Sequence, residues 1–103
     1  MKFSAFDWDR GNWPKCGKHG VSREEVEEIF AGEPAVMADP HSRELRMRAI
    51  GKTRSGRNVF LVFALRRVDG RTLIRPISAR YIHEKEIEHY ENSSSQKDAV
   101  PPE

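Results

Sequence analysis

Two side chains just before a predicted helix have the chemistry to act on a phosphate group. Lys18 and His19 precede Gly20, and the helix is expected to begin at about residue 22. A helix N-terminus attracts anions because its first backbone N–H groups lack partners within the helix. Histidine is also the side chain that exchanges a proton near neutral pH. The alternative is structural: Gly20 supplies a turn, and His19 caps the helix or fills space.

A second pair of candidates lies near the end of the last predicted strand. Arg75 and Arg80 are five residues apart on either side of Pro76. At that spacing two strand residues nominally point to opposite faces. A bulge near Pro76, or a strand that ends before Arg80, would bring them together. The planar guanidinium suits phosphate because it donates two hydrogen bonds at once. The alternative is that both arginines form salt bridges with the acidic helices.

Four aromatic side chains are candidates for stacking on unpaired bases: Phe6, Trp8, Trp13 and Tyr81. Stacking on aromatic rings is the usual way in which proteins hold single-stranded RNA. In a small domain such residues are more often part of the core, and we assign Phe6 and Trp8 to it. Both interpretations stay open for Trp13 and Tyr81.

The residues that bind metals do not form a recognisable pattern. No two of the four histidines have the spacing of a known zinc motif, and Cys16 is the only cysteine. There is also no glycine-rich phosphate loop between a strand and a helix. The sequence therefore predicts no metal site and no cofactor.

Positive charge is concentrated in the middle of the chain. Residues 43–80 hold eleven Lys/Arg and two Asp/Glu, a net charge of +9, although the whole chain carries only +2. The segments before and after are acidic. Such a block indicates a site for a polyanion, or else an arginine-rich face that is simply solvated.

The length of 103 residues is enough for one domain. No apolar run approaches the roughly 18 residues needed to cross a membrane, and the N-terminus lacks the apolar stretch of a signal peptide. A single cysteine excludes an internal disulfide and agrees with a reducing compartment. We expect a cytoplasmic protein with one domain over residues 1–91 and a disordered tail over 92–103.

Local patterns predict an α+β fold, because helices and strands are segregated along the chain. Ser22 and Glu25 form a capping box that starts a helix over about 22–31, and Gly32 with Pro34 ends it. A second helix is expected at 82–91, and at most one helical turn at 9–20. Strands are expected at 2–8, 35–38, 44–51, 58–65 and 72–79.

The strands are expected to form a small antiparallel meander between the two helices. Arg46 and Arg48 alternate with apolar residues, so they should share one face of their strand. The apolar run at 58–65 predicts a central strand. Asp69-Gly70 predicts a tight hairpin turn, and Pro76 argues for an edge or a bulge.

Several motifs, in this order, resemble those of the BrnT toxin family. They are Phe6-Asp7-Trp8-Asp9, Lys18-His19-Gly20-Val21-Ser22 with Glu24-Glu25, Ile50-Gly51 with Gly56-Arg57, Arg75-x-Ile77-Ser78-Ala79-Arg80, and Glu86 with Tyr90. Each is short, but their order and spacing extend over about residues 3–91. The resemblance implies a RelE-like ribonuclease fold and the toxin of a bacterial type II toxin–antitoxin pair, which cuts RNA without a metal and arrests growth.

The resemblance also implies partners. The antitoxin of the family, BrnA, carries a ribbon-helix-helix domain that binds DNA, and the toxin–antitoxin complex represses its own operon. We therefore expect an RNA substrate, a BrnA-like antitoxin, contact with DNA only through that antitoxin, and no membrane.

For an RNA-cutting site we assign His19 as the base or the acid, with Lys18 beside it. Arg80, and with it Arg75, would hold the scissile phosphate. The alternative is a module that binds nucleic acid or an antitoxin and cuts nothing. Further RNA contacts are expected from Arg46, Arg48, Tyr81 and His83, of which Tyr81 or His83 is the second proton donor.

Overall fold

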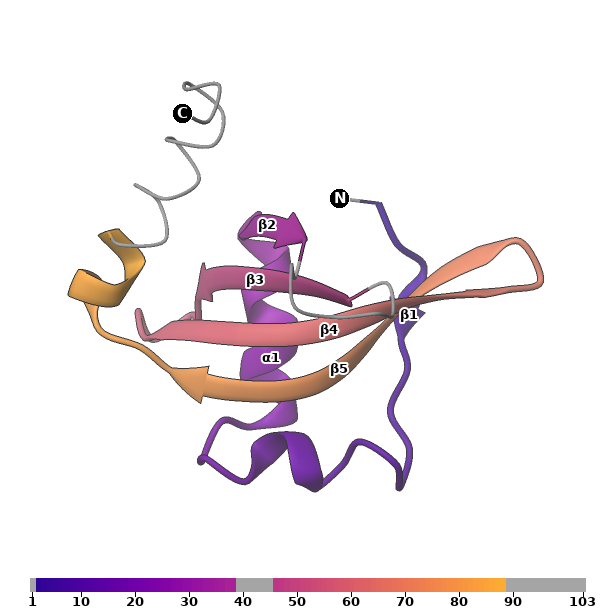
Figure 1. The fold of residues 1–103 in the computed structure, drawn as a ribbon, viewed down its shortest axis with the longest axis horizontal. Helices are drawn as coiled ribbons and strands as arrows, with labels where there is room; N and C mark the ends of the chain where they lie inside the picture. Colours follow the sequence, from indigo (N-terminus) through magenta and orange to yellow (C-terminus); the bar gives the residue numbers. More distant parts are fainter. Residues whose placement is uncertain (1, 39–45, 89–103) are drawn as a thin grey trace, which may run out of the picture.

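The computed structural model describes residues 2–38 and 46–88, which form one mixed β-sheet with helices beside it (Figure 1). The strands are β1 (Ala5–Phe6), β2 (Ala35–Ala38), β3 (Arg46–Lys52), β4 (Asn58–Val68) and β5 (Arg71–Tyr81). Their order in the sheet is β1-β5-β4-β3-β2. The predicted α+β class is confirmed.

The expected antiparallel meander is only part of this sheet. Strands β2 to β5 pair antiparallel in chain order, as predicted. The short strand β1 instead pairs parallel to β5, with Ala5 opposite Leu73 and Phe6 opposite Ile74. The prediction of a purely antiparallel sheet is therefore wrong. The pattern of residues 2–8 indicated a strand but held no information about its partner.

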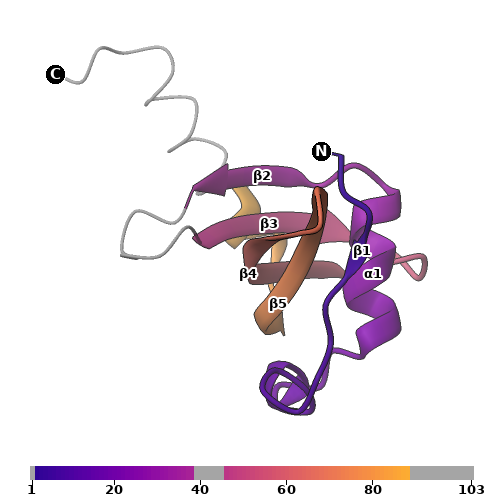
Figure 2. The same ribbon diagram turned by 90° about the vertical axis from the view of Figure 1, so that its right-hand side faces the viewer.

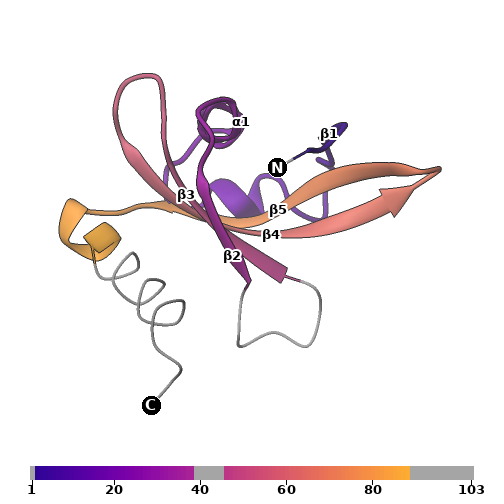
Figure 3. The same ribbon diagram turned by 90° about the horizontal axis from the view of Figure 1, so that it is seen from above.

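The predicted capping box forms the start of α1 (Arg23–Ala31). The Ser22 side chain accepts from the Glu25 backbone N–H at 3.1 Å, and Glu25 accepts from the Ser22 backbone N–H at 3.0 Å. Gly32 is the C-cap, as expected. Helix α1 lies against one face of the sheet (Figures 2 and 3). Gly51 allows this close approach, because a Cβ there would lie 2.8 Å from the Ile29 Cβ.

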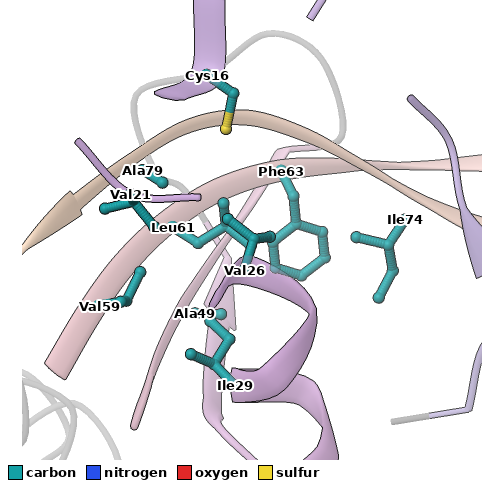
Figure 4. Close-up of a cluster of buried hydrophobic side chains, with 10 residues drawn as sticks. All are labelled: Cys16, Val21, Val26, Ile29, Ala49, Val59, Leu61, Phe63, Ile74 and Ala79. Atoms are coloured by element: carbon teal, nitrogen blue, oxygen red, sulfur yellow. The ribbon is translucent and has the colours of Figure 1, made fainter. Parts of the chain in front are cut away.

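The core lies between α1 and the sheet (Figure 4). Val26 and Ile29 of the helix and Leu61 and Phe63 of β4 are fully buried. Strand β4 is central, as predicted. Its alternate residues on the far face, such as Phe60, are half-buried. The helix therefore covers one face of the sheet and leaves the other for polar side chains.

Two predicted turns and a helix are also confirmed where they are described. Asp69 and Gly70 join β4 to β5, both with positive φ. A single turn of 3-10 helix, η1 (Lys15–Gly17), lies in the segment between β1 and α1, which runs along the β5 edge of the sheet (Figure 1). Residues 84–88 are helical. Ile82 and His83 are not helical, so the helix begins two residues later than predicted. Residues 89–91 of the predicted helix, the tail at 92–103 and the first two residues of the strand at 44–51 lie outside the described residues.

Candidate functional site

A β-bulge in β5 sets the direction of the arginines in this strand. Ser78 pairs with Val62 and Pro76 with Phe63, so Ile77 between them has no partner in β4. An extra residue shifts the alternation of every side chain beyond it. Arg75 pairs with Ala64 and Arg80 with Phe60, and Ala64 and Phe60 lie on the same face of β4. The two arginines therefore share a face, as a bulge near Pro76 was expected to allow.

Strand β3 contributes to the same face. Arg46 pairs with Ala64 and Arg48 with Val62, whereas Ala49 pairs with the buried Leu61 on the face that α1 covers. Paired residues point to the same side of a sheet. Arg66 of β4 also lies on the side opposite α1. We call this surface the arginine face; it consists of Arg46, Arg48, Arg66, Arg75 and Arg80.

Arg75 is held by the carboxylates of the N-terminal segment. Its guanidinium donates to Asp9 Oδ1 at 2.9 Å, to Asp9 Oδ2 at 3.0 Å and to Asp7 Oδ2 at 3.2 Å. Arg66 also donates to Asp7, at 2.8 Å. The hydrogen bond from Arg75 lowers the pKa of Asp9, and that to Asp9 raises the pKa of Arg75. Arg75 thus forms salt bridges, as the structural alternative held. Its partners are Asp7 and Asp9 of the N-terminal segment, however, and not residues of the acidic helices.

Asn12 fixes the N-terminal segment to β5. This side chain is 4% exposed. Its amide nitrogen donates to the backbone oxygens of Asp7 (2.8 Å) and Pro76 (2.9 Å), and its oxygen accepts from the Asp9 backbone N–H at 2.8 Å. Both carboxylates that bind Arg75 are thereby held beside the strand.

Arg80 is paired with an acidic residue of the last helix. Its guanidinium donates to Glu86 Oε2 at 3.1 Å, and it lies 5.1 Å from the centre of the Phe60 ring. The side chains of Arg80 and Glu86 remain 41% and 39% exposed. The hydrogen bond from Arg80 lowers the pKa of Glu86. This pair is open to solvent, so a phosphate group can replace the carboxylate at low cost.

Lys18 and Arg75, predicted from distant parts of the sequence, line one pocket. The pocket has a volume of about 220 Å³, and its wall also includes Lys15, Asn12 and Ser78. Lys18 and His19 are both exposed in the turn between η1 and α1. The turn depends on Gly20, whose φ is +97°. The described contacts do not bring His19 together with Arg80.

Tyr81 forms a second cluster where β5 ends. Its hydroxyl donates to Glu25 Oε1 at 2.5 Å and lies 3.3 Å from the backbone oxygen of Gly20. The Arg57 guanidinium lies over the ring, with Cζ 3.4 Å from its centre. The hydrogen bond to Glu25 raises the pKa of Tyr81. Burial alone would raise the pKa of Glu25, but the hydrogen bonds from Tyr81 and Ser22 lower it. Tyr81 therefore keeps its proton and Glu25 its charge near neutral pH.

His83 lies beside this cluster. A pocket of about 300 Å³ at this end of the sheet is lined by Gly56, Arg57, Asn58, Tyr81, Ile82, His83 and Glu84. The two predicted RNA contacts Tyr81 and His83 thus share one pocket. Sequence reasoning missed the contributions of Arg57 and Glu25. Both residues belong to the motifs that resemble the BrnT family, and Glu25 also to the capping box, but no local signal linked either residue to Tyr81.

The remaining aromatic candidates, Phe6, Trp8 and Trp13, are half-buried and pack against the hydrophobic core. Phe6 makes edge-to-face contacts with Phe3 and Phe30, beside the core. The Trp8 and Trp13 rings meet edge to face at 5.5 Å. These three side chains pack against the core without being part of it, so the assignment of Phe6 and Trp8 to the core holds only in part.

Within residues 2–38 and 46–88, no three His, Cys, Asp or Glu side chains come together as a potential metal site. Burial raises the pKa of the Cys16 thiol to about 11, so this side chain stays protonated. In the same residues no helix is long and apolar enough to span a membrane.

Comparison with known proteins identifies one family. The model of a family described as the ribonuclease toxin BrnT of type II toxin–antitoxin systems matches residues 8–86, which is more than half of the chain. That range includes all five residues of the arginine face as well as Lys18, His19 and Tyr81. A search of curated proteins finds no match.

Proposed function

The chain belongs to the BrnT family of ribonuclease toxins of type II toxin–antitoxin systems, and we propose that its arginine face and the turn at Lys18 and His19 form the site where RNA is bound and cut. The observation that carries this proposal is the bulge at Ile77, which turns Arg75 and Arg80 to the same side as the arginines of β3. Five guanidinium groups on one face suit a backbone of successive phosphates.

Within this face we assign Arg80 to the scissile phosphate. Arg80 is half-buried, with 41% of its side chain exposed, and its ion pair with Glu86 is accessible to solvent. Arg75 donates to two carboxylates and lies in a wall of the pocket beside Lys18. We propose that Arg75 and Lys18 contact a neighbouring phosphate of the strand. Arg46 and Arg48 extend the path across β3.

The proposed reaction is attack of the RNA 2′-oxygen on the adjacent phosphorus, without a metal. A base takes the 2′-hydroxyl proton, the bond to the 5′-oxygen breaks, and an acid protonates that oxygen. We assign His19 to one of these proton transfers. We assign the donating step to Tyr81 or His83. The Tyr81 hydroxyl donates to Glu25 in the free protein, so it would have to change partner to protonate the 5′-oxygen. Arginine and lysine stabilise the charge that builds on the phosphorus.

A type II toxin implies a protein antitoxin and an RNA substrate. We propose that the antitoxin is a BrnA-like ribbon-helix-helix protein whose acidic segment covers Arg46, Arg48 and Arg80. Such a segment would exclude RNA from the same surface, and DNA would be reached only through the antitoxin. We further propose a RelE-like arrangement of the meander and the helices, and a site of action in the cytoplasm.

The test is induced expression without an antitoxin, comparing the wild type with Arg80→Ala. Arg54→Ala is the matched control, because Arg54 is an exposed arginine beside Glu28 of α1, away from the arginine face. Growth arrest and RNA decay in the wild type and the control, but not in Arg80→Ala, would support the assignment. If Arg80→Ala is soluble and folded but still degrades RNA at the wild-type rate, the proposed site is wrong.

A further inference from the structure

The pocket beside Tyr81 has the features of a site for a single nucleobase. Its volume of about 300 Å³ is at the lower end of the range for small-molecule pockets, roughly 300–1,000 Å³. A planar ring system therefore fits, and a folded oligonucleotide does not. The pocket lies where β4 begins and β5 ends. Tyr81 pairs with the buried Val59, so its side chain lies on the face that α1 covers, opposite to that of Arg80.

The stacking surface is already assembled. The Arg57 guanidinium lies over the Tyr81 ring, with Cζ 3.4 Å from the ring centre, and Arg57 is exposed. One face of the guanidinium plane is therefore occupied, and the other is available to a ligand. Bases of single-stranded RNA stack on guanidinium planes as they do on aromatic rings. A base on the outer face would complete a stack of three planar groups, with Arg57 in the middle.

Both layers of this surface are held in place before a ligand binds. The Tyr81 hydroxyl is fixed by its hydrogen bond to Glu25. The turn that carries Arg57 is closed by Thr53, which accepts from the Arg57 backbone N–H at 3.1 Å and donates its own backbone N–H to the Arg57 oxygen at 2.9 Å. Preorganisation of this kind reduces the entropy that is lost when a ligand binds.

The charges of the pocket favour a base over a phosphate. Glu84 lines the pocket. The carboxylate of Glu25 does not line it but accepts the hydrogen bond from the Tyr81 hydroxyl. The two carboxylates outnumber the guanidinium of Arg57, which also lines the pocket, and so oppose the entry of an anion. Asn58, His83 and Glu84 offer donors and acceptors for the polar edge of a neutral base. We propose that this pocket holds a base of the RNA strand near the cut, stacked on Arg57 where the strand passes the end of the sheet, and that it contributes to the nucleotide preference of cleavage. This inference rests on the proposed RNA-cutting function.

The test compares Arg57→Lys with the wild type. Lysine keeps the positive charge but has no plane on which a base can stack. Arg54→Lys, in the same turn, is the matched control. RNA oligonucleotides randomised around the cut site are digested, and the cut ends are sequenced. For Arg57→Lys we expect the preference at one nucleotide beside the cut to fall by about fivefold to a hundredfold, the range for losing one base stack. The control should keep the wild-type profile.

A second measurement does not depend on cleavage. An RNA with 2-aminopurine beside the cut site, and a 2′-deoxy nucleotide that blocks cutting, reports stacking through loss of fluorescence. Wild type and Arg54→Lys should quench it, and Arg57→Lys should not. Unchanged cleavage preference and unchanged quenching in Arg57→Lys would overturn the pocket while leaving the RNA-cutting function intact. A wild-type protein that neither cuts nor binds RNA would overturn the proposed function, and the pocket with it.

Discussion

Arg75 and Arg80 lie on the same face of β5 although five residues separate them, because Ile77 between them has no partner in β4. The two side chains are nevertheless held differently. Asp7 and Asp9 bind Arg75 with three hydrogen bonds, whereas Arg80 meets one carboxylate in an exposed pair. Arg80 is therefore the more available of the two for a phosphate group.

This difference predicts opposite effects of two substitutions on RNA binding. Arg80→Ala removes a phosphate contact, so the slope of log K against log salt should become shallower by about 0.7. Glu86→Gln removes the carboxylate that competes for Arg80, so it should tighten binding at low salt. Fluorescence anisotropy with a labelled, non-cleavable RNA measures both. Weaker binding by Glu86→Gln would mean that Glu86 positions Arg80 rather than competing for it.

Asn12 should be essential for the stability of the N-terminal segment. Replacing it by Ala leaves three buried or part-buried backbone groups without their partner, at a cost of about 1–3 kcal/mol in the free energy of unfolding. Asn12→Asp should cost more, because a carboxylate would face the backbone oxygens of Asp7 and Pro76. Urea denaturation gives both values. Equal stability of the two variants would contradict this account.

Gly51 should tolerate no side chain, because α1 lies close to β3. A Cβ would come within 2.8 Å of the Ile29 Cβ and 3.0 Å of the Pro34 Cβ. We expect Gly51→Ala to destabilise the protein by about 1–3 kcal/mol, as overpacked cores do. Gly32→Ala is the control, since the nearest atom to its Cβ is 3.9 Å away. Thermal unfolding of the two variants measures the difference.

The hydrogen bond between Tyr81 and Glu25 should be visible in a phenol titration. The Glu25 carboxylate raises the pKa of Tyr81, so Glu25→Gln should lower that pKa toward its ordinary value. Glutamine can still serve the capping box, which keeps the helix start intact. Ultraviolet absorbance during a titration from neutral to alkaline pH follows the tyrosine, in a Tyr90→Phe background that leaves one signal. An unchanged titration curve would argue against the hydrogen bond.

Two carboxylates should make the protein sensitive to acid. Hydrogen bonds from Arg75 and Arg80 lower the pKa values of Asp9 and Glu86 in the folded state. A lowered folded-state pKa contributes stability above the unfolded pKa, and this contribution is lost as the pH falls through the folded value. This contribution to stability should therefore be lost below about pH 4. Asp9→Asn with Glu86→Gln should show a smaller drop in Tm between neutral and acid pH than the wild type. An equal drop would assign acid sensitivity to other groups.

Local signals were sufficient to predict much of the fold. The capping box at Ser22 and Glu25, the turn at Asp69-Gly70 and the alternation of Arg46 and Arg48 each depend on neighbours within a few residues. Such patterns constrain backbone geometry directly, so the elements they predicted lie where they were expected.

Contacts between distant segments were not predictable in the same way. Nothing in residues 2–8 shows that β1 pairs parallel to β5, or that Asp7 and Asp9 bind Arg75. Pro76 suggested an edge or a bulge, but only the register with β4 identifies Ile77 as the extra residue. Glu25 and Tyr81 are 56 positions apart, so their hydrogen bond emerges only from the folded chain.

The position of β5 between β1 and β4 also bears on how the protein is made. The first strand has its partner in the last, so the N-terminal segment has no place in the sheet until residues 71–81 have left the ribosome. The same late segment carries Arg75 and Arg80. Until then the nascent chain lacks two of the five cations of its basic surface. A toxin with this strand order therefore becomes complete only after β5 has emerged.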